Sequence, residues 1–252
     1  MKTITFINEK GGIGKTSCCF NIAWELSKRG NRVLMIDLDG QRANLTFFSG
    51  IEKTNQLKTI YDVLIQKEKL KDTIIPLKEN LSIAPANFYL SGLPQNAPVL
   101  PLMKELHSLQ DEYDYVFIDV NPTPNRCHAI SFAVSDYAVI PMLPDIASLE
   151  ANLGIAESIE EIHLGGSKLK VLGIVFNRND NRTNLSKEVH GVAEEFAKTL
   201  DTTVFDVKIR QAVALSENVY EHIGITDYAP KSNAAKDYIE LTDEFLRRLE
   251  EE

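Results

Sequence analysis

The sequence predicts an α/β fold, in which helices cover both faces of a mostly parallel sheet and give three αβα layers. Short apolar runs typical of strands alternate with helical stretches, which is the order of a parallel sheet with helical crossovers. The runs are mostly apolar, with a few Thr and Ser residues among them, as in strands that are largely buried on both faces. The first run leads into a glycine-rich turn and a helix, at the end of a strand where such sheets bind ligands. The runs are residues 4–7, 33–36, 81–84, 116–118, 138–142, 171–176 and 203–205.

The other elements follow from local signals. A first helix is expected over residues 15–29, because Gly30 supplies a C-terminal stop. Between residues 50 and 101, charges and prolines interrupt the periodicity, so we expect peripheral helices and loops around one short strand. Residues 233–252 have apolar side chains at helical spacing and predict an amphipathic helix docked on the body.

Size and charge limit the function classes. With 252 residues and 44% hydrophobic content, the chain can form a single domain over residues 1–252. A net charge of −9 argues against wholesale wrapping of nucleic acid, so any DNA binding should be local and sensitive to salt. The cysteines Cys18, Cys19 and Cys127 show no C-x-x-C spacing and favour the reduced cytoplasm. We expect a cytoplasmic protein that neither enters a membrane nor is exported, since no run has spanning length and no signal-like segment precedes the first strand.

The turn after the first run has the composition of a phosphate-binding loop. It runs from Lys10 to Thr16 with the sequence KGGIGKT. Glycines let successive backbone N–H groups point at one anion, and the following helix directs its positive end to the same place. Lys15 is expected to reach the outer phosphates of a nucleotide, and the Thr16 hydroxyl to hold Mg²⁺. A glycine turn with two solvated lysines is the alternative, which the strand before it and the helix after it disfavour.

The second lysine of the loop, Lys10, indicates a narrower class. One lysine is enough for the outer phosphates of a nucleotide, so Lys10 suggests a charge intended for a nucleotide held by a facing subunit. The motif resembles that of the deviant Walker A ATPases of the ParA/MinD superfamily, K-G-G-x-G-K-[ST], and is most similar to the small, Soj-like ParA partition ATPases. The resemblance implies a P-loop NTPase fold of the SIMIBI type, with ATP and Mg²⁺ as cofactors. The implied nucleotide-binding residues of the loop are Lys10, Gly11, Gly12, Ile13, Gly14, Lys15, Thr16 and Ser17.

Two acids follow the second strand. Alternation along a strand puts Asp37 and Asp39 on the same side, near the phosphate loop. The resemblance implies that Asp39 positions the attacking water as a catalytic residue with Lys10 and Lys15, and that Asp37 helps to hold the Mg²⁺ shell. The family usually continues D-x-D-P-Q-x-N, whereas Gly40 replaces the proline here and one further residue precedes the asparagine. A strand that simply ends in a turn is the alternative.

A third acid, Asp119, follows the apolar run 116–118 as in a Walker B motif, which indicates a carboxylate near the Mg²⁺. Relatives usually continue with two prolines, whereas this chain has Asn121 before Pro122, which affects how the loop senses the γ-phosphate.

Contacts to the adenine base are implied by the resemblance at two places. In several relatives an asparagine after the sixth run meets the adenine edge, which indicates Asn177 with Arg178, and a later loop supplies further contacts from Ile209 and Arg210. A polar residue that closes a strand is the alternative. Residues 182–185 and 213–217 also look like the partition branch of the superfamily.

The implied function is a timed switch. Two subunits close over two ATP molecules, each Lys10 reaches the phosphates held by its partner, and hydrolysis loosens the homodimer. The first choice of process is plasmid or chromosome partition, in which the dimer binds DNA nonspecifically and a centromere-bound, ParB-like protein stimulates slow turnover. Because the sequence begins at the phosphate-loop strand, we expect no N-terminal DNA-reading domain and no promoter repression. Candidate DNA contacts are Lys231, Lys236, Arg247 and Arg248, with Arg210 as a further one.

Alternatives to this function remain. The candidate DNA contacts also fit a solvated basic fringe, and Ala214 stands where relatives often have a basic residue. A MinD-like protein that positions structures at the membrane or pole would need a basic C-terminal amphipathic helix, whereas residues 240–252 are predominantly acidic. A third possibility is a scaffold of a conjugation or secretion machine that binds ATP without useful turnover.

Overall fold

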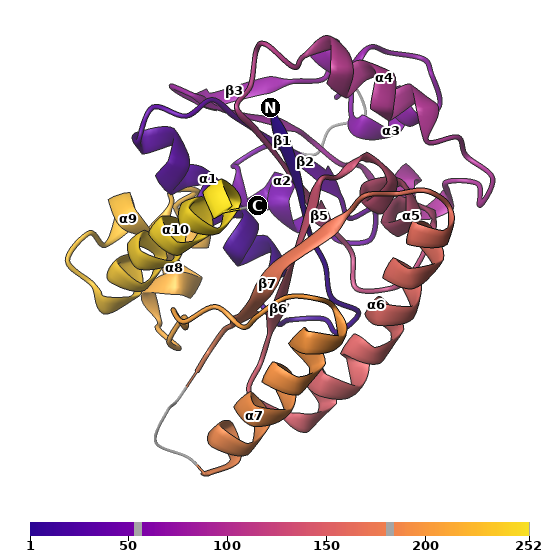
Figure 1. The fold of residues 1–252 in the computed structure, drawn as a ribbon. Helices are drawn as coiled ribbons and strands as arrows, with labels where there is room; N and C mark the ends of the chain where they lie inside the picture. Colours follow the sequence, from indigo (N-terminus) through magenta and orange to yellow (C-terminus); the bar gives the residue numbers. More distant parts are fainter. Residues whose placement is uncertain (53–56, 180–183, 252) are drawn as a thin grey trace.

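A single seven-stranded sheet forms the centre of the computed structural model (Figure 1). The structure describes residues 1–52, 57–179 and 184–251, without the side chains of 146–153 and 184–187. The strand order is β3-β4-β2-β5-β1-β6-β7, and every pair is parallel except β3 with β4. The strands are β1 Lys2–Phe6, β2 Val33–Leu38, β3 Ile75–Lys78, β4 Leu81–Ala84, β5 Tyr115–Val120, β6 Tyr137–Met142 and β7 Lys170–Phe176.

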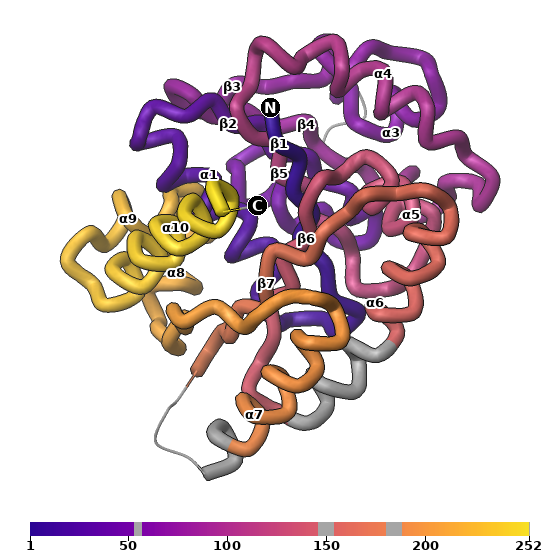
Figure 2. The backbone as a smooth tube through the Cα atoms, viewed as in Figure 1, coloured from indigo at the N-terminus to yellow at the C-terminus, as the bar shows by residue number. Residues whose placement is uncertain are grey.

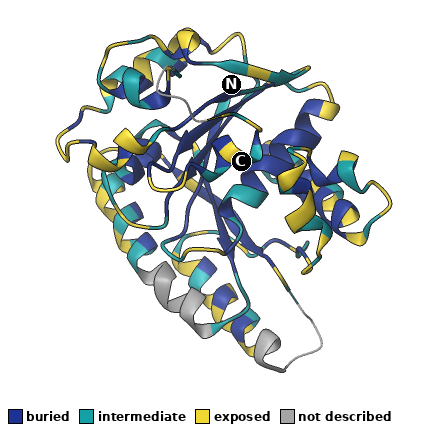
Figure 3. Cartoon of the chain, turned by 180° about the vertical axis from the view of Figure 1, so that it is seen from behind, coloured by how far each residue is buried: buried dark blue, intermediate teal, exposed yellow. Residues whose placement is uncertain are grey.

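Helices cover both faces of the sheet, so the predicted three-layer αβα fold is confirmed (Figures 1 and 3). One face packs against α1 and α10, and the other packs against α3 to α7. The helices are α1 Lys15–Lys28, α2 Asn44–Phe48, α3 Ile60–Leu64, α4 Leu100–Ser108, α5 Arg126–Val134, α6 Ile146–Leu164, α7 Asn184–Thr199, α8 Ala214–Tyr220, α9 Ile225–Tyr228 and α10 Asn233–Glu251, with 3₁₀ turns η1 Leu70–Asp72 and η2 Phe88–Gly92.

The packing of the strands explains why most of their residues are apolar. In β2, Leu34 and Ile36 pack into the cluster under α3 to α7, whereas Val33 and Met35 pack into the cluster under α1 and α10. Successive side chains of a strand point to opposite faces, so a strand covered by helices on both sides has no solvent face. All six residues of β2 are buried, in agreement with this pattern.

The prediction of a strand over residues 203–205 is wrong. Val204 makes only an isolated bridge to Ile174. The N–H of Ile174 donates to the carbonyl of Thr203 at 3.2 Å, and the N–H of Phe205 donates to the carbonyl of Ile174 at 2.8 Å, so pairing with β7 stops at this one bridge. The guanidinium of Arg248 also donates to the carbonyl oxygens of Thr203 and Val204 at 3.3 and 2.8 Å and stacks on the ring of Phe205.

The sequence also gave no sign of β3. This antiparallel strand contains a proline and lies at the edge of the sheet, where a missing N–H is tolerated.

The predicted C-terminal helix is present as α10, and Glu252 lies outside the described residues. It lies alongside α1, as the tube in Figure 2 shows. Its buried face includes Tyr238, Phe245 and Leu249. In the described part of the chain no helix has the length and apolar character that crossing a membrane requires.

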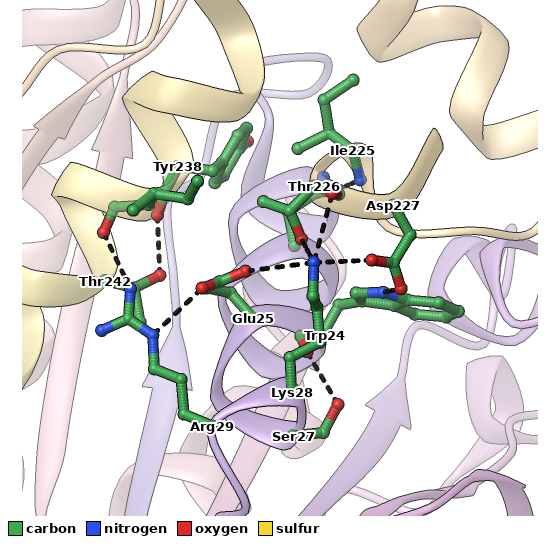
Figure 4. A network of polar contacts seen from close by, with 12 residues as sticks. Trp24, Glu25, Ser27, Lys28, Arg29, Ile225, Thr226, Asp227, Tyr238 and Thr242 are labelled. Atoms are coloured by element: carbon green, nitrogen blue, oxygen red, sulfur yellow. Dashed lines mark hydrogen bonds and ion pairs between the residues drawn. The ribbon is translucent and has the colours of Figure 1, made fainter. Parts of the chain in front are cut away.

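A polar network ties α1 to the segment that carries α9 and α10 (Figure 4). Asp227 accepts a hydrogen bond from Trp24 Nε1 at 2.8 Å and forms an ion pair with Lys28 at 2.6 Å. A Cβ at Gly224 would lie 2.1 Å from the Trp24 ring, so only glycine fits this approach. Because α1 begins at the phosphate loop, the network fixes the C-terminal segment relative to that loop.

Candidate nucleotide site

The glycine-rich loop lies between β1 and α1, at the carboxyl ends of the parallel strands. Gly12 and Gly14 have φ values of +75° and +94°, which L side chains rarely adopt. A Cβ at Gly14 would also lie 2.7 Å from Asn177 Nδ2. The loop lines a cavity of about 610 Å³ together with residues of the β2–α2 and β5–α5 loops. The predicted loop residues Gly11 to Ser17 all line this cavity.

Lys15 is held inside the site. Its side chain is buried, and Nζ donates to the carbonyl oxygen of Lys10 at 3.1 Å. Burial lowers the pKa of Lys15, and the nearby Asp119 and Asp39 carboxylates oppose that shift. A desolvated ammonium beside an anion-binding loop is arranged to interact strongly with phosphate oxygens.

Thr16 and Asp119 form a pair that fits Mg²⁺. The Thr16 hydroxyl donates to Asp119 Oδ2 at 2.7 Å, and among the described residues the buried Asp119 Oδ1 has no hydrogen-bond partner. Burial raises the pKa of Asp119 well above its usual range, which shows how poorly solvated this carboxyl is. No cluster of three His, Cys, Asp or Glu side chains suited to a metal occurs in the described part of the chain. A hydroxyl and a carboxylate are oxygen donors of the kind that Mg²⁺ takes together with phosphates and water, so this pair fits that ion.

Asp39 organises the β2–α2 loop at the wall of the cavity. Its Oδ1 accepts the backbone N–H groups of Gln41 and Arg42 at 3.0 and 3.1 Å. Its own carbonyl accepts from the N–H of Ala43, which has a φ of +48°. The Asp39 carboxylate is nearly buried yet lines the cavity, so it is placed to face a bound triphosphate.

Asp37 has a different set of contacts from the metal shell that the sequence suggested. Its Oδ1 accepts from the N–H of Asp39 at 2.9 Å, and its Oδ2 accepts from the N–H and the hydroxyl of Thr46 at 2.8 and 2.7 Å. Burial raises its pKa to about 6. The side chain is fully buried and is not among the described residues that line the cavity. It anchors both ends of the β2–α2 loop.

Gly40 stands where the family pattern has a proline, and contacts with η2 explain why a larger residue does not fit there. A Cβ at this position would lie 2.4 Å from the backbone nitrogen of Ser91 and 2.6 Å from Leu90 Cβ. The turn η2 therefore packs directly on the loop, at a distance that excludes both alanine and proline.

Lys10 lies on the phosphate loop but is paired within its own chain. Its Nζ lies 2.7 and 2.9 Å from the two carboxylate oxygens of Asp145, which follows β6. Its backbone N–H donates to Asn8 Oδ1 at 2.9 Å. The expected contact with a partner's nucleotide therefore requires the Lys10 ammonium to leave Asp145.

Asn121, the second departure from the family pattern, is buried in the β5–α5 loop. His128 Nε2 lies 2.6 Å from the Asn121 carbonyl oxygen, and Asn125 Nδ2 donates to Asn121 Oδ1 at 3.3 Å. Burial lowers the pKa of His128, so its neutral ring is favoured in this position. The loop that carries Pro122 to the cavity wall is thus held from inside the protein.

A second cavity of about 440 Å³ adjoins the first and contains all the positions predicted to meet the base. Asn177, however, directs its amide at the phosphate loop: Nδ2 donates to the carbonyl of Ile13 at 2.8 Å. Arg210 is bound through its guanidinium to both oxygens of Asp237, each at 2.7 Å. The structure thus groups Asn177, Arg178, Ile209 and Arg210 around one cavity but gives two of these side chains other partners. The sequence also resembles the partition branch at residues 182–185. Positions 182 and 183 lie outside the described residues, and so do the side chains of 184 and 185.

The candidate DNA contacts divide into two groups. Lys231, Lys236 and Arg247 are exposed. Arg248 is only 12% exposed at its side chain, pairs with Glu244 at 2.8 Å and binds three backbone carbonyls. The prediction of Arg248 as a DNA contact is therefore corrected, because its guanidinium is already used to hold α10 against residues 172 and 203–205. Arg210 pairs with Asp237, but its side chain is 49% exposed, so it remains a further candidate.

Sequence reasoning missed several cavity residues. Gln41, Arg42 and Asn44 line the first cavity from the β2–α2 loop, and Tyr238 of α10 lines the second. The polar composition directly after the D-x-D motif was a signal for the first three. Tyr238 looked like one apolar position of an amphipathic helix, and its place at the site depends on the docking of α10.

A glycine-rich anion site at the end of β1, with a partly buried threonine–aspartate pair beside it, defines a P-loop nucleoside triphosphatase. The family described as "AAA domain" matches residues 1–171. Sporulation initiation inhibitor protein Soj of Bacillus subtilis (strain 168) is 32% identical over 251 residues, covering 96% of this chain and 97% of Soj. The virulence plasmid ParA family protein pGP5-D of Chlamydia psittaci is 30% identical, covering 99% and 96%.

The structural comparison agrees. The septum site-determining protein MinD from Pyrococcus horikoshii OT3, solved with Mg-ADP, matches with a TM-score of 0.77 and 25% identity, covering 96% of this chain and 95% of MinD. The chain therefore belongs to the ParA/MinD superfamily of P-loop ATPases, as the KGGIGKT motif predicts.

Proposed function

We propose that residues 1–252 act as one ATPase domain that binds ATP with Mg²⁺, dimerises and hydrolyses ATP in plasmid or chromosome partition. The observation that carries this proposal is the Thr16–Asp119 pair beside the phosphate loop, with one Asp119 oxygen buried and unpartnered among the described residues. The full-length similarity to Soj and to a plasmid ParA family protein supports partition as the process.

Each residue of the site has a proposed task. The backbone N–H groups of residues 11–16 and the Lys15 ammonium bind the phosphates, and Thr16 with Asp119 holds Mg²⁺, which supplies positive charge to the phosphate oxygens when bound. Asp39 orients the attacking water from the opposite wall of the cavity. Asp37 acts only through the loop that it anchors.

The dimer depends on Lys10. In its own chain Lys10 pairs with Asp145, whose side chain is 40% exposed, so this ion pair is accessible to solvent and weak enough to exchange. A triphosphate presented by a second subunit carries more negative charge than one carboxylate. We propose that Lys10 breaks its ion pair with Asp145 to bind that triphosphate. When hydrolysis removes the γ-phosphate, Lys10 forms the ion pair with Asp145 again.

DNA binding is proposed as nonspecific and as residing on the exposed candidates Lys231, Lys236 and Arg247, with the exposed Arg210 as a further one. The intervening Glu240 and Asp243 keep this face of α10 mixed in charge, which favours weak, salt-sensitive binding. A ParB-like partner would stimulate turnover, and the protein would be found in the cytoplasm, on the nucleoid. The buried face of α10, with Phe245 and Leu249 in the core, disfavours a lipid anchor at this helix.

Two measurements test the proposal. Phosphate release should require Mg²⁺ and fall at least about tenfold in Asp39→Ala, which keeps nucleotide binding; equal release from the native and variant proteins would remove Asp39 from its task. Co-sedimentation with plasmid DNA or with anionic liposomes, in ATP and in ADP, tests the process. Binding to liposomes but not to DNA would contradict partition and favour membrane positioning.

A further inference from the structure

One arginine that lines the first cavity has no role in the phosphate-binding loop, the threonine–aspartate pair or the Asp39 position described above. This arginine, Arg42, lines the cavity from the β2–α2 loop. Among the described residues that line this cavity, the cations are Lys15, Arg42 and Arg178, and the only carboxylate is Asp39. The cavity therefore has an excess of positive charge, which suits a polyanion.

The two arginines lie at different ends of the nucleotide space. Arg178 lines both cavities, so it lies where they meet, between phosphates and base. Arg42 lines the first cavity but not the second, on the same loop as Asp39. If the phosphates run from that junction along the glycine-rich loop, the terminal phosphate lies at the Asp39 end.

The backbone of Arg42 is fixed. Its N–H donates to Asp39 Oδ1 at 3.1 Å, and the following N–H of Ala43 donates to the Asp39 carbonyl at 2.8 Å. The start of α2 is held by Asp37 through Thr46. Only the side chain of Arg42 has to adjust, which limits the entropy lost when it binds a ligand.

We propose that Arg42 binds the γ-phosphate of ATP and makes this site prefer a triphosphate over a diphosphate. A guanidinium forms two parallel, charge-assisted hydrogen bonds to phosphate oxygens, so its contribution is large only when the terminal phosphate is present. The inference rests on the proposed ATP site and adds a residue that distinguishes ATP from ADP within one subunit.

The test compares the affinities of Arg42→Ala, Arg42→Lys, Arg178→Ala and native protein for Mg²⁺·ATPγS and Mg²⁺·ADP by calorimetry. Light scattering selects protein concentrations at which every sample is monomeric, so dimerisation does not enter the affinity. Arg42→Ala should lower the ATPγS-to-ADP preference about tenfold or more, with ADP binding within about twofold of native. Arg42→Lys should keep part of the preference, and Arg178→Ala should weaken both nucleotides alike.

The charge-matched control is Lys71→Ala, an exposed cation of η1 that lines neither cavity, which should leave both affinities unchanged. An unaltered preference in Arg42→Ala, or an equal loss of both nucleotides, would overturn the inference and leave the proposed function standing. If the native protein binds neither nucleotide, the proposed function itself fails.

Discussion

The ammonium of Lys10 lies 2.7 Å from one oxygen of Asp145 and 2.9 Å from the other, so the second lysine of the phosphate loop is ion-paired within its own subunit. The motif assigns Lys10 to a partner's nucleotide, but in this structure Lys10 forms an ion pair with the nearby Asp145 carboxylate. Asp145 follows β6, and Lys10 precedes α1, so the pair joins two loops at the same edge of the sheet.

This pair gives opposite predictions for its two members. Lys10→Ala should bind nucleotide as the native protein does but lose ATP-dependent dimerisation, because the charge in trans is gone. Asp145→Asn should dimerise at a lower ATP concentration, because Lys10 no longer has to leave an ion pair. Light scattering at increasing ATP concentration measures both effects. Dimerisation of Lys10→Ala at the native ATP concentration would contradict the proposed role of Lys10.

Gly40→Ala should destabilise the protein. The added Cβ would lie 2.4 Å from the backbone nitrogen of Ser91, so loop and turn must move apart, at a cost of about 1–3 kcal/mol in the free energy of unfolding. Gly92→Ala is the control, since no described heavy atom lies within 4 Å of a Cβ there. Urea denaturation measures both variants, and similar midpoints for the two would show that η2 does not restrict Gly40.

His128 should make the stability depend on pH. Burial lowers its folded-state pKa below the unfolded value of about 6.5. The stability that the neutral ring contributes is therefore complete above pH 6.5 and is lost as the pH falls through the folded-state pKa. His128→Gln keeps a donor for the Asn121 carbonyl but does not titrate. Between pH 7 and pH 5 the native protein should lose more unfolding free energy than this variant, and parallel curves would exclude His128 as the source.

Arg248 and Arg247 are neighbours on α10 with different expected roles. Arg248→Ala removes hydrogen bonds to the carbonyls of Leu172, Thr203 and Val204 and leaves Glu244 without this cation, so unfolding free energy should fall by about 2–4 kcal/mol. Arg247→Ala, at an exposed position, should change it by less than about 0.5 kcal/mol.

DNA co-sedimentation separates the two further. Arg247→Ala should weaken DNA binding in ATP, while Arg248→Ala should retain it at temperatures where the variant is folded. Loss of DNA binding in folded Arg248→Ala alone would reverse the assignment made from their exposure.

Local sequence signals predicted much of the fold. A run that is apolar at every position, such as residues 33–36, has to be covered on both faces, and this indicates the layered architecture found around β2. The prediction of a strand over residues 203–205 was wrong because their pairing with β7 stops at one bridge, and Arg248, 45 and 44 positions away in the sequence, also binds the carbonyls of Thr203 and Val204. β3 was missed because an edge strand with a proline carries little periodic signal.

The sequence by itself determined the family and the identity of the phosphate-binding loop. The glycines set the backbone of the loop, and the side chains of Lys15 and Thr16 follow within a few consecutive residues, so the whole motif is local in sequence. Only the tertiary structure decided the partners of the long or charged side chains. It turned Asp37 toward Thr46, Asn177 toward Ile13, Arg248 toward backbone carbonyls and Lys10 toward Asp145. A buried polar group has to find a hydrogen-bond partner wherever packing brings one, and that partner is set by the arrangement of distant segments rather than by sequence neighbours.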